Sequence, residues 1–132
     1  MKKFLILCVG LCGGLLMVAT DRASAADVVP KKVLRHLVLY KFKTETTPAQ
    51  VQEVIDAFSK LAKQVDTIIG YEHGTNVSKE MKDDGLTHCF MVMFKDEAGR
   101  DAYIKHPAHD AYVQVVKDKR EKVIVVDFWS EP

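Results

Sequence analysis

Apolar residues occupy both sets of alternate positions along residues 33–43 and 86–94, a pattern that predicts two buried β-strands. One face of the first strand would carry Leu34, His36, Val38, Tyr40 and Phe42. Its opposite face also carries leucines, at Leu37 and Leu39. A sheet that helices cover on one side only should be polar on the other. We therefore expect both faces to be buried, and a second copy of the same sheet is the economical cover in a small domain.

The segment after the first strand has the pattern of an amphipathic helix. Thr47 and Gln50 have the spacing of a capping box, and Pro48 suits the first helical position. Apolar residues then recur at steps of three and four, which predicts one helix of about 18 residues. Residues 68–77 follow as a weaker strand at a sheet edge. Residues 78–85 follow as a charged loop.

Pro107 divides the next helical segment. A proline disfavours helical geometry at the residue before it and suits the first turn of a new helix. Residues 96–105 and 107–120 are therefore predicted to be separate helices, and residues 123–129 to be the last strand. The order is β-α-β-β-α-α-β, a ferredoxin-like α+β fold with an antiparallel sheet whose central strands are the first and the third.

The start of the chain has the organisation of a secretory signal peptide. Two lysines precede an apolar run, and a small-x-small cleavage signature ends at Ala25. The run is shorter than the ~20 residues of a membrane-spanning helix, so no stable membrane anchor is expected. We divide the chain into a signal peptide (1–25), a linker (26–32) and one domain (33–130). We expect export to the periplasm or the extracellular space.

Charge and cysteine content argue against several function classes. The full chain has a formal net charge of +1, which argues against a nucleic-acid partner held by electrostatics. Cleavage at the predicted site would leave Cys89 as the last cysteine, so no internal disulfide could form. Cys89 lies in mid-strand and is expected to be inert, and no phosphate-binding loop occurs, so no cofactor is predicted. A domain this small buries a modest core, and a homodimer is the expected state.

Residues 101–112 hold the side chains best suited to chemistry. His106 and His109 lie three positions apart on either side of Pro107, and Tyr103 lies one helical turn before His106. Histidine titrates near neutral pH, so His109 could take a proton from a carbon next to a carbonyl and return it. The alternative is that His109 is a structural residue that fixes the corner, and that Tyr103 packs with its hydroxyl at the rim.

The topology also predicts which residues share a site. The third strand should start at the end of the sheet where the following helix finishes, so we expect His88 near Tyr103 and His109. By the same argument, His36 should lie towards the opposite end. His106 should face solvent or cap the preceding helix. The two histidines of the corner could bind a metal together with His88, but the proline between them turns the backbone, and no metal site is predicted.

Three short segments carry a family resemblance. They are residues 35–43, residues 85–88, and the His-Pro-Ala-His sequence that begins at His106. Together they resemble the stress-responsive α/β-barrel (Dabb) family, and the resemblance extends over residues 33–130. It implies a homodimer in which two such sheets pair into a dimeric α/β barrel.

One plant member of this family is a polyketide cyclase that closes a ring by aldol chemistry. The resemblance matches its catalytic tyrosine and histidine to Tyr103 and His109, so that Tyr103 would donate a hydrogen bond to a developing enolate oxygen. Its other pocket histidines match His36 and His88, whereas a tyrosine of its pocket corresponds here to Phe58. The expected ligand pocket is then formed by His36, Tyr40, Phe58 and His88.

Three functions stay open on the sequence. The first is an exported, stress-related homodimer that binds a small hydrophobic molecule. The second is a cyclase or a related lyase that uses Tyr103 and His109 in acid-base chemistry. The third is a stable structural dimer without a ligand.

Overall fold

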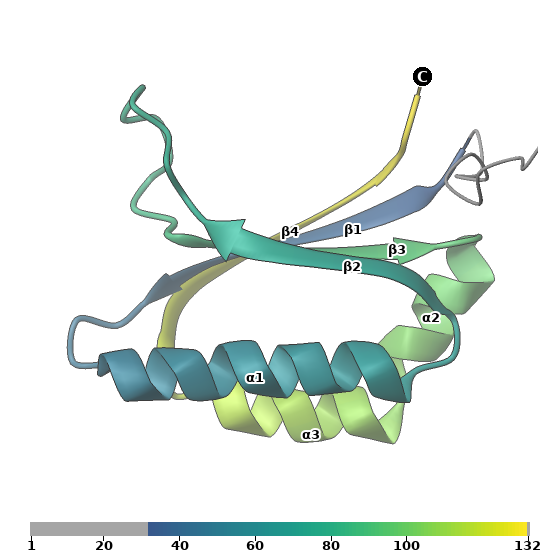
Figure 1. Ribbon diagram of the computed structural model, residues 1–132, viewed down its shortest axis with the longest axis horizontal. Coiled ribbons are helices and arrows are strands. Elements are labelled where there is room, and N and C mark those ends of the chain that lie inside the picture. Colours follow the sequence, from purple (N-terminus) through teal and green to yellow (C-terminus); the bar gives the residue numbers. More distant parts are fainter. Residues whose placement is uncertain (1–31, 132) are drawn as a thin grey trace, which may run out of the picture.

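The computed structural model describes residues 32–131. The expected signal peptide and nearly all of the expected linker lie outside the described residues. The elements are β1 (Leu34–Phe42), α1 (Pro48–Gln64), β2 (Ile68–Thr75), β3 (His88–Phe94), α2 (Glu97–Ile104), α3 (Pro107–Val116) and β4 (Arg120–Trp129) (Figure 1). This order confirms the predicted ferredoxin-like α+β fold.

The strands form one antiparallel sheet in the order β2-β3-β1-β4, so β1 and β3 are central as predicted. Leu34 of β1 lies opposite Phe94 of β3, and Tyr40 lies opposite His88. These two pairs mark the two ends of the sheet. We call the end with Leu34 and Phe94 the Phe94 end, and the chain passes from β3 to α2 there. We call the end with Tyr40 and His88 the His88 end.

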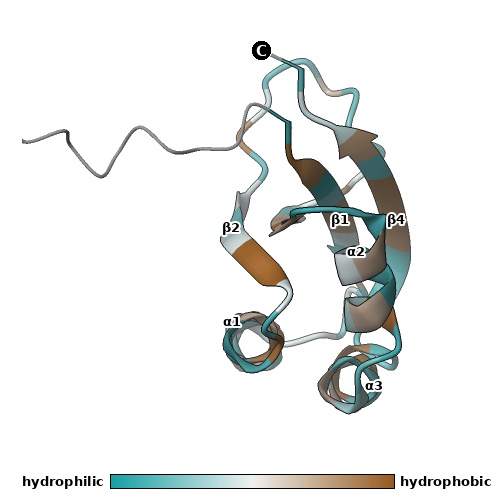
Figure 2. Ribbon diagram, turned by 90° about the vertical axis from the view of Figure 1, so that its right-hand side faces the viewer, coloured by the Kyte–Doolittle hydropathy of each residue, from teal (hydrophilic) through white to brown (hydrophobic). Residues whose placement is uncertain are grey.

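Helices α1 and α3 cover one face of the sheet, the inner face (Figures 1 and 2). The predicted capping box starts α1: the Gln50 N–H donates to Thr47 Oγ1 at 3.3 Å, and the Thr47 N–H donates to Gln50 Oε1 at 2.9 Å. Phe58 of α1 is fully buried and stacks on Phe90 of β3 with the ring centroids 4.6 Å apart. Burying one such side chain contributes about 1.5–3 kcal/mol, so this contact is a main support of the inner layer.

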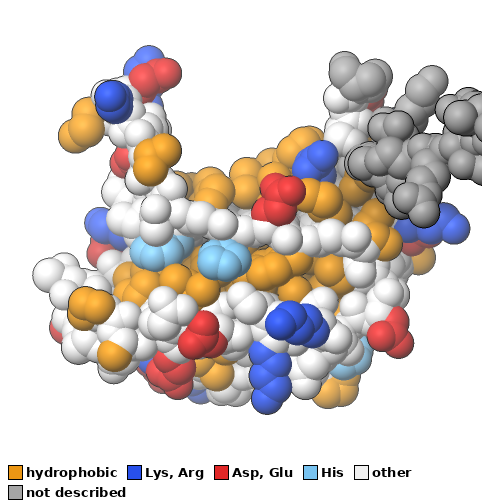
Figure 3. Space-filling view, in the orientation of Figure 1, with side chains coloured by type: hydrophobic (Ala, Val, Ile, Leu, Met, Phe, Trp, Pro, Cys, Tyr) orange, Lys and Arg blue, Asp and Glu red, His pale blue; other side chains and the backbone are white. Residues whose placement is uncertain are grey.

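The opposite face of the sheet, the outer face, is apolar and has no described element packed on it. Its central cross-strand rows are Cys89–Leu39–Ile124 and Met91–Leu37–Val126. Val126 is 45% exposed and Phe128 is 40% exposed. Figure 3 shows apolar side chains lying bare between the loop that projects after β2 and the C-terminal end of β4. The predicted apolar character of both faces is confirmed, although helices cover only one of them.

Several element boundaries differ from the predicted ones. β2 ends at Thr75 and β3 begins at His88, because the chain between them leaves the sheet as a long loop. α3 ends at Val116, where a turn begins in which the Lys119 N–H donates to the Val116 carbonyl at 3.0 Å. β4 therefore begins at Arg120, three residues before the predicted start.

Candidate functional site

The corner between α2 and α3 has the predicted form. α2 ends at Ile104, and α3 begins at Pro107. His106 stands between them as the cap of the following helix, not of the preceding one, because its Nδ1 accepts a hydrogen bond from the Ala108 N–H at 3.0 Å. This bond fixes the start of α3 and leaves His109, in the first turn, facing the sheet side of the helix.

Three aromatic rings form a row at this corner. The Tyr103 ring lies 4.8 Å from the His109 ring and 5.6 Å from the His36 ring, centroid to centroid, with edge-to-face geometry at both contacts. Tyr103 comes from the end of α2, His109 from α3 and His36 from β1. The row therefore joins α2, α3 and β1.

A cavity of about 230 Å³ opens between α3 and the inner face of β1 and β4. Its apolar lining is formed by Val38, Phe58, Val113, Val123 and Val125, and its polar lining by Tyr40, Tyr103, His109, Tyr112 and Arg120. Val125 is 51% exposed although it is on the inner face, because α3 leaves this edge of the sheet uncovered. The cavity is thus a mostly apolar space with several hydroxyl and nitrogen groups at its wall.

The Tyr103 hydroxyl faces this cavity. The side chain is 1% exposed, yet none of the described residues forms a hydrogen bond with the hydroxyl. No fully buried side-chain oxygen or nitrogen among the described residues lacks a partner, so the hydroxyl must open into the cavity. Burial raises the pKa of Tyr103 well above the ordinary value, and at neutral pH the group is a protonated donor.

His109, in contrast to Tyr103, is suited to accept a proton. Partial burial lowers its pKa below 6.5, and the neighbouring His36 lowers it further, against a smaller opposing effect of Asp110. His109 is therefore neutral at pH 7 and can accept a proton. A protonated phenol and a neutral imidazole in contact form a donor and acceptor pair without a net charge.

His36 is held from behind by a charged pair. Its Nδ1 lies 2.6 Å from Asp127 Oδ1, and Asp127 Oδ2 accepts a hydrogen bond from Arg100 at 2.9 Å. Asp127 lies directly opposite His36 across β1 and β4. This arrangement fixes the His36 ring against Tyr103, so Asp127 positions a residue of the row without itself lining the cavity.

Comparisons with known proteins show which family this chain belongs to. The family description "Stress responsive A/B Barrel Domain" (Dabb) matches residues 34–130. The chain belongs to the Dabb family. It is 30% identical to olivetolic acid cyclase of Cannabis sativa over 95 residues, which cover 72% of this chain and 94% of that protein.

Two further relatives extend the comparison. Stress-response A/B barrel domain-containing protein HS1 of Arabidopsis thaliana is 29% identical over 98 residues, covering 74% of this chain and 90% of that protein. A dimeric ferredoxin-like protein of unknown function from Thermobifida fusca superposes with a TM-score of 0.64 at 25% identity, covering 75% of this chain and 92% of that one. The match to Dabb proteins thus spans nearly all of the described chain.

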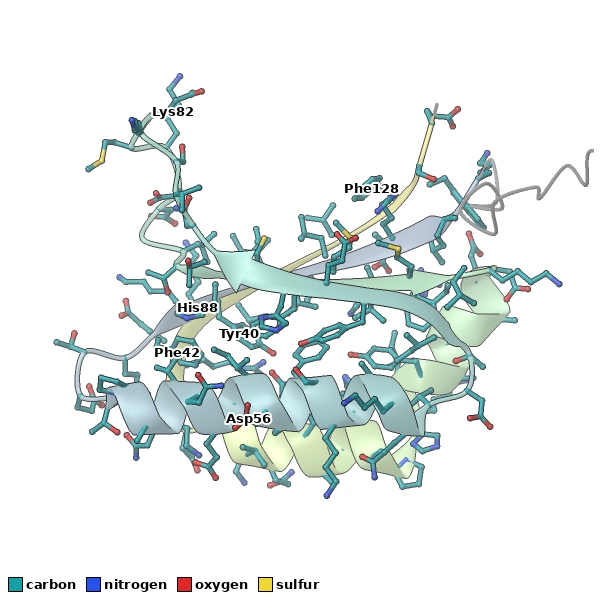
Figure 4. All side chains as sticks on the ribbon, viewed as in Figure 1. Tyr40, Phe42, Asp56, Lys82, His88 and Phe128 are labelled. Atoms are coloured by element: carbon teal, nitrogen blue, oxygen red, sulfur yellow. The ribbon has the colours of Figure 1, made fainter. Side chains whose placement is uncertain are left out.

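The Dabb domain of this chain places its histidines differently from our prediction. His36 was expected at the end of the sheet opposite the corner, but its ring contacts the Tyr103 ring. His88 was expected beside Tyr103, but it lies at the other end of the sheet, where its ring centroid is 5.0 Å from that of Phe42 (Figure 4). The prediction was wrong because it assumed that the helix after β3 runs back along the full length of the sheet, to the end where β3 starts. α2 has eight residues and crosses the Phe94 end (Figure 1), so the corner stays near the start of β1.

Two of the four residues expected to form the ligand pocket line this cavity, whereas His36 and His88 do not. Tyr40 and Phe58 both line the cavity beside Tyr103 and His109. Sequence reasoning missed Tyr112 of α3, whose hydroxyl bonds to the Tyr40 hydroxyl at 3.0 Å.

Arg120 and Asp127 were missed as functional residues. Arg120 was predicted to end a helix, and Asp127 interrupts the apolar strand predicted over residues 123–129. A signal for Asp127 existed, since an acidic residue at an inward-facing position of such a strand needs a partner. Arg120 was assigned to the end of the predicted helix of residues 107–120, so its position in β4 was not foreseen.

A second hollow lies outside this site. Its volume is about 700 Å³, and it lies between the outer face at Leu39 and Ile124 and the projecting loop of residues 76–87. Figure 4 shows Lys82 at the tip of this loop, far from the helices. His88 lines this hollow and not the cavity at Tyr103.

Two further findings concern residues 32–131. No group of three or more histidine, cysteine, aspartate or glutamate side chains in this range is placed to hold a metal ion. Within the same range no helix has both the length and the apolar character needed to cross a membrane. His106 and His109 do not converge on a common point with His88, because His88 lies at the other end of the sheet.

Proposed function

We propose that this Dabb domain binds a small, largely apolar molecule in the cavity over Tyr103 and His109. The observation that carries the proposal is the cavity itself: five apolar side chains form its wall, and the unbonded Tyr103 hydroxyl opens into it. Ligand sites have this composition, in which apolar walls supply affinity and a few polar groups fix orientation. A volume of about 230 Å³ suits one ring with a short substituent, since cavities of about 150 Å³ already bind benzene.

The proposal includes a homodimer formed through the outer face. The bare rows centred on Leu37 and Leu39 are too apolar to favour contact with water, and a second copy of the sheet would cover them. Relatives of this chain are described as dimeric. The cavity at Tyr103 is on the inner face, so dimer formation through the outer face would leave its opening free.

Export is also part of the proposal. The amino-terminal charge, apolar run and cleavage signature are those of a signal peptide. The ligand would then be met outside the cytoplasm, and the stress-related role follows from the family alone.

A second candidate function is acid-base catalysis in the same cavity, favoured by the contact of a protonated Tyr103 with a neutral His109. His109 would remove a proton from a carbon next to a carbonyl, and the electron pair of the broken C–H bond would move to the carbonyl oxygen. Tyr103 would donate a hydrogen bond to that oxygen. The enolate carbon would then attack a second carbonyl carbon of the substrate, as in an aldol cyclisation, and the protonated His109 would return its proton to the oxygen of that carbonyl. The relative named olivetolic acid cyclase supports this candidate.

Filling the cavity tests the binding proposal. The purified protein is titrated with 4-butylbenzamide, a neutral amphipathic probe, and amide chemical shifts are followed by NMR. We expect saturable shifts at α3 and β4 that are lost in Val125→Trp, which would fill the open edge of the cavity. The control His88→Ala changes a side chain at the other end of the sheet and should bind the probe as the wild type does. Shifts that survive in Val125→Trp, or that are confined to the hollow at Ile124, would contradict the assignment.

The catalytic candidate needs a separate measurement. A short β-polyketide thioester is incubated with wild type, His109→Ala and Tyr103→Phe, and cyclised product is measured by chromatography. Loss of product in both variants, while 4-butylbenzamide still binds, would support catalysis. Absence of turnover in a wild type that binds the probe would leave binding as the function.

A further inference from the structure

Arg120 is placed on the cavity side of the sheet by a β-bulge. β1 and β4 pair in register from Leu34 with Trp129 as far as Lys41 with Lys122, but Phe42 then pairs with Arg120, and Glu121 is the extra residue. In a regular strand Arg120 would share the outer face with Lys122, because side chains alternate with a period of two. The bulge reverses this, and Arg120 joins Phe42 on the inner face.

The backbone around Arg120 is held firmly. The Lys43 N–H and the Thr46 hydroxyl both donate to the Lys119 carbonyl, at 2.9 Å and 2.8 Å. The extra residue Glu121 is engaged by Lys41 at 2.8 Å. The bulge is thus fixed on both sides, and the position of the Arg120 side chain is a built feature of the corner between α3 and β4.

The charge of Arg120 has no counter-ion among residues 32–131. The adjacent Glu121 pairs with Lys41 instead, and no ion pair joins any described carboxylate to Arg120 within 4.0 Å. The guanidinium lies over the Tyr40 ring, 5.7 Å from its centroid, at the wall of the cavity. An arginine at the wall of a mostly apolar cavity, without an anionic partner, can pair with an anion that enters it.

The tyrosine pair beside Arg120 has an unused donor. The Tyr40 and Tyr112 hydroxyls are 3.0 Å apart, and both side chains are buried. Each hydroxyl carries one proton, and the bond between them uses only one. No described residue accepts the other proton. An anion held by Arg120 would supply the missing acceptor.

We propose that Arg120, together with the Tyr40–Tyr112 pair, binds a carboxylate, so that the ligand of the cavity is a small acid with an apolar body. The planar guanidinium pairs with a carboxylate through two parallel hydrogen bonds. The valines at positions 38, 113, 123 and 125 then receive the apolar body, with Tyr103 and His109 on the far side. This inference rests on the proposed function and adds the chemical class of the ligand to it.

Two matched probes test the inference. 4-Butylbenzoate and 4-butylbenzamide have nearly the same shape, but only the first is an anion at pH 7. In the wild type we expect the benzoate to bind about 10- to 100-fold more tightly than the amide, the range of one charged hydrogen-bonded pair. In Arg120→Met the two probes should bind about equally, mainly through loss of benzoate affinity, and Arg120→Lys should restore part of the preference. If the NMR spectrum of the backbone amides shows that Arg120→Met is not folded, Arg120→Gln replaces it.

The outcomes separate the two proposals. Equal binding of both probes to the wild type, or equal weakening of both by Arg120→Met, would overturn the assignment of Arg120 and leave the cavity as a binding site. No binding of either probe would overturn the proposed function and this inference together. A preference for benzoate that persists in Arg120→Met would place the anion elsewhere and would also overturn the inference.

Discussion

Replacing Asp127 by alanine removes the carboxylate that holds both His36 and Arg100. The His36 Nδ1 lies 2.6 Å from Asp127, and the His36 side chain is only 8% exposed, so water cannot readily replace the lost partner. A buried polar group left without a partner costs about 1–3 kcal/mol. Arg100 keeps Asp101 as a partner, and losing its contact with the partly exposed Asp127 should add at most about 1 kcal/mol.

We therefore expect Asp127→Ala to lower the free energy of unfolding by about 1–4 kcal/mol. Asp127→Asn keeps an oxygen that can accept from His36, and its cost should be about 1 kcal/mol. The matched control is Asp101→Asn, which removes the other, more exposed partner of Arg100 and should cost no more than about 1 kcal/mol.

The free energy of unfolding is measured by urea titration with circular dichroism, at one protein concentration because a dimer would make stability depend on it. In a domain of this size each kcal/mol should also shift Tm by about 4–8 °C. If Asp127→Ala and Asp101→Asn proved equally mild, Asp127 would not be holding His36, and our account of the ring row would be wrong.

Three further predictions test the core, the charge state of the site and the outer face. Phe58→Ala removes a fully buried ring stacked on Phe90 and should cost about 3–5 kcal/mol in urea unfolding; a loss below about 1 kcal/mol would contradict the packing described. His109 has a lowered pKa in the folded state, so the unfolded chain binds more protons below about pH 6.5, and stability should fall as the pH falls through that range. His109→Gln should flatten this dependence, and an unchanged slope would contradict the assignment. Val126→Asp places a charge on the outer face and should convert a dimer to monomers in sedimentation velocity at micromolar concentration, whereas a wild type that is itself monomeric would refute the proposed dimer.

The fold could be predicted because its pattern is local. The capping box at Thr47, the apolar stripe of α1 and the break at Pro107 each depend on residues within a few positions of one another. The alternation along β1 also revealed that both sheet faces are apolar, and the order of helices and strands along the chain indicated the ferredoxin-like arrangement of the strands. The ends of α3 and β4 were less accurate, because the turn at Lys119 is set by contacts with Thr46 that the local sequence does not encode.

The site could be predicted only in part, because it depends on how far each element travels. Tyr103 and His109 were found from their spacing around a proline. His36 and His88 were exchanged, because the direction of α2 relative to the sheet is a tertiary property. Arg120 was missed for a different reason: it was assigned to the helix of residues 107–120, whereas it begins β4, where a single extra residue also sets the face on which it lies.

The most direct test of the central claim is to locate a bound molecule in solution. Intermolecular nuclear Overhauser effects are measured between the butyl chain of 4-butylbenzoate and methyl-labelled protein. We predict contacts from the chain to the methyl groups of Val113, Val123 and Val125, and to the Tyr103 ring. Contacts to Leu39 and Ile124 in their place would put the ligand in the hollow on the outer face and would contradict the assignment of the cavity as the functional site.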